Sequence, residues 1–150
     1  MSMLTKLKYV GVKTEDLIDI YILYIRSLTE YCSVAFHSTL SVEQSSKIER
    51  IQKTCLKIIL GDMYVDYIAA LEMTGLQTLS DRRENRCLRF SLKSIKHERN
   101  HTLFPLNKIA GISNTRQSEK FTVNFANTSK YRASAIPYCQ RILNTHFKNK

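Results

Sequence analysis

Apolar residues recur every three or four positions through most of residues 14–98, which is the spacing of amphipathic helices. The first helix is predicted to begin at Thr14, a residue type that caps helix N-termini, followed by Glu15 and Asp16, which suit the positive end of the helix dipole. Its apolar positions lie on more than one side, so we expect it at the centre of a bundle. These positions are Leu17, Ile18, Ile20, Tyr21, Tyr24, Ile25, Leu28 and Tyr31.

A capping box predicts the start of a second helix at Ser41. In this motif the side chains of Ser41 and Gln44 each accept a hydrogen bond from the other residue's backbone N–H. We expect this helix to end near Leu60, because Gly61 suits the left-handed conformation that closes many helices. One of its faces is apolar, and the other is basic through Lys47, Arg50, Lys53 and Lys57.

A short helix is predicted over residues 65–73, before Gly75, and a longer one over residues 79–98. Basic residues of the longer helix follow one another at steps of three or four. At 100° per residue they occupy an arc about 80° wide, which predicts one continuous basic ridge. The ridge consists of Arg82, Arg86, Arg89, Lys93 and Lys96.

The helical periodicity weakens beyond His101. Polar residues together with Pro105 and Gly111 predict loops, and we expect residues 101–136 to be flexible without a partner. A short helix is predicted over residues 138–146. The sequence therefore predicts an all-α fold: a bundle of four to five helices over residues 1–100, then a basic, loosely structured extension over residues 101–150.

The net charge of +10 is distributed unevenly. Residues 1–98 carry 14 basic and 12 acidic side chains, whereas residues 99–150 carry nine basic and one acidic. This asymmetry favours a polyanionic partner, with nucleic acid ahead of a membrane surface. The alternative is a solvated basic segment without a specific partner. No membrane span is expected, because the apolar run over residues 17–28 is short and interrupted by Asp19 and Arg26.

Phosphate contact is the chemistry that the basic positions favour. The ridge of residues 82–96 has no interleaved acids, and Lys53 and Lys57 of the second helix provide a smaller basic surface. Contacts of this kind hold the backbone of RNA or DNA without reading its sequence. The alternative is that both surfaces are ordinary solvated helix faces.

Catalytic, cofactor and metal sites are not expected. The aspartates are not gathered as a two-metal polymerase site requires. His97 and His101 have a metal-binding spacing but no third or fourth ligand nearby. The cysteines lack a Cys-x-x-Cys pattern and no signal peptide is recognised, so we expect free thiols and an intracellular, non-secreted protein of the nucleus or cytoplasm.

Several short motifs follow one another between about Leu7 and Phe147. They are Tyr24-Ile25-Arg26-Ser27-Leu28-Thr29-Glu30-Tyr31-Cys32, Phe36-His37-Ser38-Thr39-Leu40, Ile48-Glu49-Arg50-Ile51-Gln52-Lys53, Ile58-Ile59-Leu60-Gly61, Gly75-Leu76-Gln77-Thr78-Leu79, Asp81-Arg82-Arg83-Glu84, Cys87-Leu88-Arg89-Phe90 and Ser134-Ala135-Ile136-Pro137-Tyr138. In this order and spacing they resemble the region downstream of the reverse transcriptase in LINE-type, jockey-like non-LTR retrotransposon polyproteins. One departure is Phe36, where that family usually has Trp; the packing role of the ring is preserved.

The resemblance implies a helical region after the palm, around and beyond the thumb, of an RNA-directed DNA polymerase polyprotein, without palm, fingers or endonuclease. The position of Met1 suggests a truncated or degenerate copy. We therefore expect a non-catalytic fragment that contacts nucleic acid through the ridge, assisted by Lys53 and Lys57, with a reverse transcriptase core as a possible partner. The alternative is a helical structural or protein-interaction module without nucleic-acid binding, whose interface is the tyrosine-rich surface of the first helix.

Arg26 and Glu30 are expected to have a structural role. They stand one turn apart among apolar residues, where an unpaired charge costs several kcal/mol. We expect them to pair with each other or to bridge the first two helices. Arg83 and Glu84 lie off the ridge and are expected to tether the fourth helix in a similar way.

Overall fold

The structure is a computed structural model that describes residues 2–107 and 120–148. It confirms the all-α fold: within these residues there is no strand, and a single isolated antiparallel bridge joins Leu106 to Phe121. The chain divides into two compact units. Unit 1 comprises residues 1–32 and 40–83, and unit 2 comprises residues 33–39 and 84–150. This division differs from the boundary near residue 100 that the sequence predicts.

Unit 1 is built mainly from the two long helical segments that the sequence predicts. Its elements are α1 (Ser2–Tyr9), α2 (Thr14–Ile20), the π-helical turn η1 (Tyr21–Arg26), α3 (Ser27–Glu30), α5 (Val42–Leu60), the 3₁₀ turn η3 (Gly61–Met63) and α6 (Tyr67–Thr74). The predicted start at Thr14 is confirmed, but Thr14 is the first helical residue and does not cap the helix, because Lys13 occupies the N-cap position and makes no side-chain hydrogen bond there. Helices α2, η1 and α3 follow one another without a break. Helix α1 was not predicted; its Leu4 is fully buried, and Lys8 Nζ donates a hydrogen bond to Ile59 O at 2.9 Å.

Local signals set the ends of α5 and α6. The capping box is confirmed, because Gln44 N donates to Ser41 Oγ at 3.1 Å and Ser41 N donates to Gln44 Oε1 at 2.9 Å. Helix α5 ends at Gly61, whose φ of +58° disfavours residues with a side chain. Helix α6 is capped by Asp66, whose carboxylate accepts a hydrogen bond from Ala69 N at 2.8 Å, and it ends at the left-handed Gly75.

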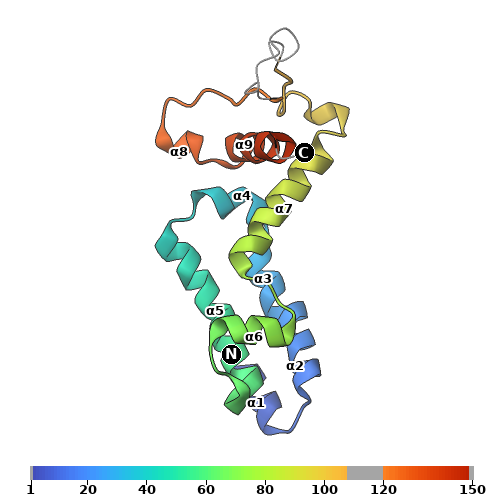
Figure 1. The fold of residues 1–150 in the computed structure, drawn as a ribbon, viewed down its shortest axis with the longest axis vertical. Helices are drawn as coiled ribbons and strands as arrows, with labels where there is room; N and C mark the ends of the chain where they lie inside the picture. Colours follow the sequence, from blue (N-terminus) through green and yellow to red (C-terminus); the bar gives the residue numbers. More distant parts are fainter. Residues whose placement is uncertain (1, 108–119, 149–150) are drawn as a thin grey trace. The chain divides into compact units, whose positions relative to one another are not determined.

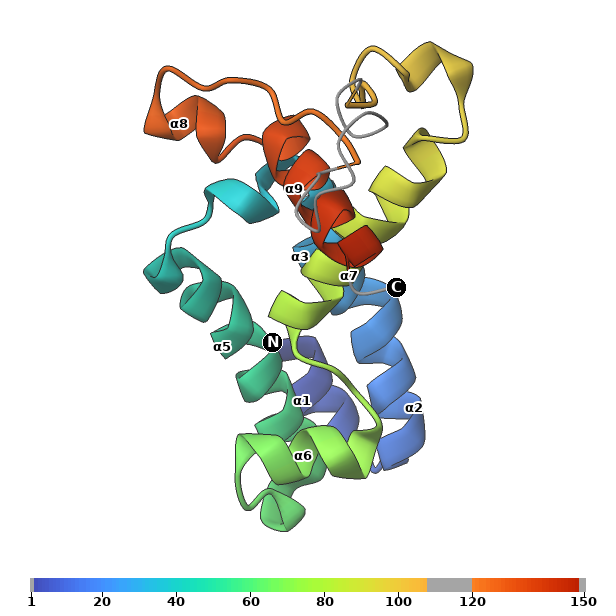
Figure 2. The same cartoon turned by 45° about the horizontal axis from the view of Figure 1, so that its top comes forward.

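The core of unit 1 lies where α1, α2 and the start of η1 meet α5 and α6 (Figures 1 and 2). Its buried side chains are Leu4, Leu17, Tyr21, Cys55, Leu56, Ile59, Leu60 and Ala70. A hydrogen-bonded glutamine lies at the edge of this core. Gln52 is fully buried, accepts a hydrogen bond from Tyr21 Oη at 2.6 Å, and donates to Tyr67 Oη at 2.9 Å and Gln77 O at 3.0 Å. These bonds satisfy a polar group that is costly to bury alone.

Unit 2 contains the remaining helices and most of α7. Its elements are α4 (Ser33–Phe36), the 3₁₀ turn η2 (His37–Thr39), α7 (Leu79–Ser94) from Glu84 onward, the 3₁₀ turn η4 (Glu98–Asn100), α8 (Ser129–Arg132) and α9 (Ala135–Lys148). The core of this unit consists of Cys87, Phe104, Phe121, Cys139 and Leu143. Residues after 101 therefore contribute most of a packed core, which the sequence did not indicate. Residues 108–119 of the predicted flexible segment lie outside the described residues.

Candidate nucleic-acid interface

Three of the predicted phosphate-binding residues form a row on α7 within unit 2. Arg86, Arg89 and Lys93 are all exposed, and at 100° per residue they fall within an arc of about 60°. Cys87 and Ser91, which lie on another side of the helix, are buried in the core of the unit. The amphipathic character of α7 thus orients the three cations away from the core. We call Arg86, Arg89 and Lys93 the α7 basic row.

An aromatic ring lies beside this row. Phe90 is 41% exposed, and it follows Arg86 by four residues and precedes Lys93 by three, the spacings at which helix side chains are neighbours. The nearest acidic residue along α7, Glu84, falls roughly 160° around the helix from Arg86. The exposed side of α7 therefore combines positive charge with an apolar ring.

The sequence predicts that Lys96 continues the row along the helix, and the structure shows that it does not. Helix α7 ends at Ser94, four residues before the predicted end. Beyond Ser94 the backbone hydrogen bonds span three residues, as in a 3₁₀ helix, and not four. Lys96 N donates to Lys93 O at 3.2 Å, and His97 N donates to Ser94 O at 3.1 Å. Lys96 is exposed just past the helix end, so the regular 80° arc does not extend to it.

Arg82 also differs from the expectation, because it has a structural partner in unit 1. Its guanidinium binds both carboxylate oxygens of Glu30, through Nε and through Nη2, the latter at 3.2 Å from Oε2. Glu30 is only 2% exposed. The hydrogen bond to this carboxylate raises the pKa of Arg82. Arg82 is therefore engaged in compensating a buried charge, and we exclude it from the candidate interface.

The remaining charged residues at the start of α7 have different environments. Arg83 is fully buried and donates a hydrogen bond from Nη2 to Ser45 Oγ at 2.8 Å, which ties α7 to α5 within unit 1 and agrees with the expected tethering role. Glu84 is exposed. Glu30 was expected to pair with Arg26 or to bridge the first two helices, and the structure joins it to α7 through Arg82.

Lys53 and Lys57 lie on α5, in unit 1, and are both exposed. Each ammonium group stands over a tyrosine ring: Lys53 Nζ is 4.8 Å from the centroid of Tyr67, and Lys57 Nζ is 5.4 Å from that of Tyr64. Cation–π contacts at exposed sites contribute about 0.5–1 kcal/mol, so they orient the lysines without neutralising them. The structure does not bring these lysines and the α7 basic row into one compact unit.

The net charges of the two units differ more than the net charges of residues 1–98 and residues 99–150 do. Unit 1 has ten basic and ten acidic residues, whereas unit 2 has thirteen basic and three acidic. The whole net charge of +10 therefore belongs to unit 2. A field of this strength and sign attracts polyanions.

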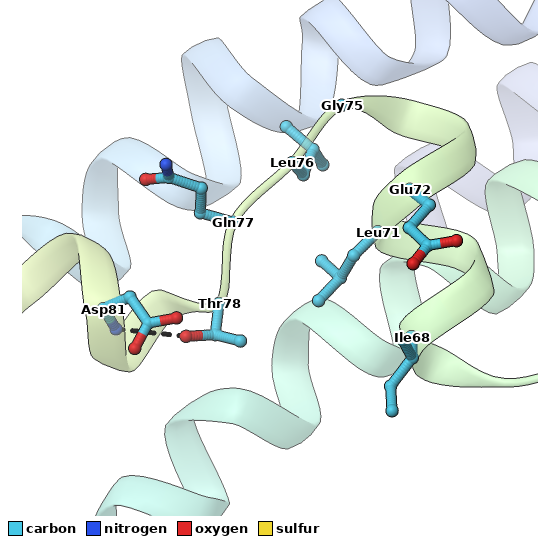
Figure 3. Close-up of a pocket in the computed structure, with 8 residues that line it drawn as sticks. All are labelled: Ile68, Leu71, Glu72, Gly75, Leu76, Gln77, Thr78 and Asp81. Carbon is cyan, nitrogen blue, oxygen red and sulfur yellow. Dashed lines mark hydrogen bonds between the residues drawn. The ribbon is translucent and has the colours of Figure 1, made fainter.

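A second candidate surface lies in unit 1, beside α6. A groove of about 420 Å³ is lined by α6 and by the segment that leads into α7. Figure 3 shows the side chains that line it. Ile68, Leu71 and Leu76 supply apolar surface, and Ile68 is 70% exposed. Glu72 and Asp81 supply negative charge. Such a groove suits an apolar segment of a protein better than it suits nucleic acid.

The described residues contain no group of three or more His, Cys, Asp and Glu side chains that could hold a metal ion. His97 and His101 are both exposed. Across residues 2–107 and 120–148, none of the helices is both long enough and apolar enough to cross a bilayer. Cys55, Cys87 and Cys139 are fully buried, whereas Cys32 is exposed, and all four are free.

Comparison of the chain with protein-family models, with curated proteins and with solved structures gives no match.

Proposed function

We propose that this chain is a non-catalytic part of a retroelement reverse transcriptase polyprotein and that it contacts the backbone of RNA or DNA through unit 2. The observation that carries the proposal is the charge distribution: unit 2 holds thirteen basic and three acidic residues, and unit 1 is neutral. The α7 basic row and the neighbouring Lys96 are the contact residues. Lys53 and Lys57, which lie in unit 1, assist.

The proposed contact is electrostatic. Basic side chains at a phosphate backbone release condensed counterions, which supplies affinity that does not depend on the base sequence. At physiological salt the charge of an exposed cation is largely screened beyond about 8 Å, so only cations close to the phosphate backbone contribute strongly. Three exposed cations within one side of a helix meet this requirement better than cations scattered over the surface.

The retroelement origin rests on the order of the motifs between Leu7 and Phe147, and a reverse transcriptase core is the protein partner that it implies. The same proposal places the chain in the nucleus or cytoplasm. Free thiols, as found at all four cysteines, are typical of those reducing compartments.

The test compares two variants of equal charge. The row variant replaces Arg86, Arg89 and Lys93 with Gln. Binding to a labelled RNA and to a labelled DNA duplex is measured by fluorescence anisotropy. The row variant is expected to have a Kd at least about ten-fold higher than that of the unmodified chain. Circular dichroism verifies that the helix content is unchanged.

The matched control replaces Lys6, Lys13 and Arg50 with Gln. These residues are also exposed, but they belong to unit 1. The control removes the same three charges, so a general effect of net charge weakens binding equally in both variants. The proposal requires a clearly smaller loss in the control than in the row variant, and equal losses contradict it.

A second candidate function, protein interaction without nucleic-acid binding, is supported by exposed apolar side chains along η1 and α3 and beyond. Leu23, Tyr24, Leu28 and Tyr31 are between 63% and 78% exposed. The groove of Figure 3 adds apolar surface in the same unit. This candidate predicts that the unmodified chain shows no salt-dependent binding of RNA or DNA. It also predicts that replacing Leu23 and Leu28 with Ser abolishes binding of the protein partner.

A further inference from the structure

A pocket of about 400 Å³ lies in unit 2, apart from the α7 basic row. Two of its lining residues are arginines, Arg132 at the end of α8 and Arg141 on α9. The other lining residues come from one extended segment and are Val123, Asn124, Phe125 and Ala126. None of the lining residues is acidic, so the two guanidinium groups give the pocket a positive potential.

Hydrogen bonds hold the walls of this pocket in place. Arg141 donates from Nη2 to Arg132 O at 2.8 Å, which joins the two arginines. Asn124 N donates to Oε1 of the fully buried Gln140 at 2.8 Å, and Gln140 Nε2 donates in turn to Leu103 O at 2.7 Å. The extended segment is thus attached to α9 by a buried side chain. Arg141 uses one of its five N–H donors in this arrangement, and the others remain for a ligand.

Phe125 adds an apolar ring to the edge of the pocket. It is 87% exposed, although it belongs to a segment in which Phe121 is 3% exposed. A ring that is exposed beside two guanidinium groups offers a stacking surface next to an anion site. Guanidinium groups bind phosphate in a bidentate manner, and aromatic rings stack on nucleobases.

We propose that this pocket binds one nucleotide unit of a single-stranded nucleic acid, with its phosphate on Arg132 and Arg141 and its base on the ring of Phe125. The inference rests on the proposed nucleic-acid contact of unit 2 and deepens it, because it names the form of nucleic acid. In a duplex the bases are stacked within the helix, so only a single strand presents a base to Phe125.

The first test uses small probes, which do not depend on the α7 basic row. Adenosine 5′-monophosphate and inorganic phosphate are titrated into the full chain, and NMR signals of the Phe125 ring and of both guanidinium groups are followed. Adenosine 5′-monophosphate is expected to bind at least about five-fold more tightly than phosphate, because it adds a stacked base. Equal affinities identify a simple anion site and overturn the inference.

Substitution separates the two parts of the ligand. Phe125→Leu keeps an apolar side chain but removes the ring, so it is expected to lower the affinity for adenosine 5′-monophosphate to that for phosphate. Arg132→Gln is expected to weaken both ligands. Tyr9→Leu, which removes a 93% exposed ring in unit 1, is the matched control and leaves both affinities unchanged. An effect of Tyr9→Leu as large as that of Phe125→Leu overturns the assignment of the pocket.

The second test uses a twelve-nucleotide single strand and the corresponding duplex. Phe125→Leu is expected to weaken single-strand binding at least about five-fold and to leave duplex binding unchanged. If it affects neither while the row variant weakens both, the pocket assignment is wrong and the proposed function stands. If the row variant has no effect while adenosine 5′-monophosphate still binds at Phe125, the pocket assignment stands and the α7 basic row is not the contact surface of the proposed function.

Discussion

Glu30 and Arg82 are 52 residues apart in the sequence, and their side chains form a two-point ion pair within unit 1. The carboxylate is 2% exposed, whereas the guanidinium side chain is 26% exposed. A buried carboxylate without such a partner is costly, because its desolvation is not compensated. The pair therefore joins the end of the first long helical segment to the start of α7.

Replacing Arg82 with Ala is expected to destabilise the protein by about 3 kcal/mol, because it removes this partner from a buried carboxylate. Urea denaturation followed by circular dichroism measures the loss. The double variant Glu30→Gln, Arg82→Ala is expected to recover a large part of it, because a neutral amide then takes the place of the buried carboxylate. A single variant as stable as the unmodified chain contradicts the pairing.

Tyr21 and Tyr24 both belong to η1, but their hydroxyl groups have different environments. Tyr21 is fully buried and donates to Gln52, whereas Tyr24 is 63% exposed. Tyr21→Phe leaves the buried Gln52 carbonyl oxygen without its donor and is expected to cost about 1–2 kcal/mol of unfolding free energy. Tyr24→Phe is expected to change it by less than about 0.5 kcal/mol. Equal effects in thermal or urea denaturation mean that the Tyr21 hydroxyl is not buried as described.

Three tyrosines make the protein sensitive to alkali. Burial raises the pKa of Tyr21 and of Tyr67, and it raises that of Tyr138 to about 12. Because the folded protein holds these protons more tightly than the unfolded chain, stability is complete below about pH 10 and decreases as the pH rises from 10 towards 12. Denaturation curves at several pH values, with tyrosinate absorbance as a second signal, measure this. A stability that is constant or rises over this range contradicts it.

Thiol reactivity is expected to follow exposure and not acidity. The hydrogen bond from the Cys87 thiol lowers the pKa of Cys139 to about 7, but Cys139 is fully buried. Cys32 is exposed. A disulfide reagent such as Ellman's reagent is therefore expected to modify Cys32 quickly and to modify the other three thiols only as the protein unfolds. A second thiol that reacts as fast as Cys32 in the folded protein contradicts the burial of these cysteines.

Helix ends set by neighbouring residues could be predicted from the sequence. The bonds between Ser41 and Gln44 are local, and the positive φ of Gly61 and of Gly75 needs no distant contact. The amphipathic pattern of α7 likewise placed three cations on its exposed side.

Features that depend on distant residues were not predicted. The partner of Arg82 lies 52 residues away along the chain, so the basic pattern alone did not separate it from the exposed residues of α7. The end of α7 before Lys96 occurs where helical periodicity continues in the sequence. The pocket beside Phe125 depends on the packing of α8 and α9, and its only local signal was an aromatic residue in a polar segment.

The salt dependence of binding tests the central claim most directly. The logarithm of the association constant for RNA or duplex DNA is expected to fall linearly with the logarithm of the salt concentration. Neutralising Arg86, Arg89 and Lys93 is expected to flatten the slope by about two to three, at roughly 0.7 per phosphate contact for a single strand and 0.9 for a duplex. A slope that the row variant leaves unchanged, in a chain that still folds, means that the α7 basic row does not contact phosphates.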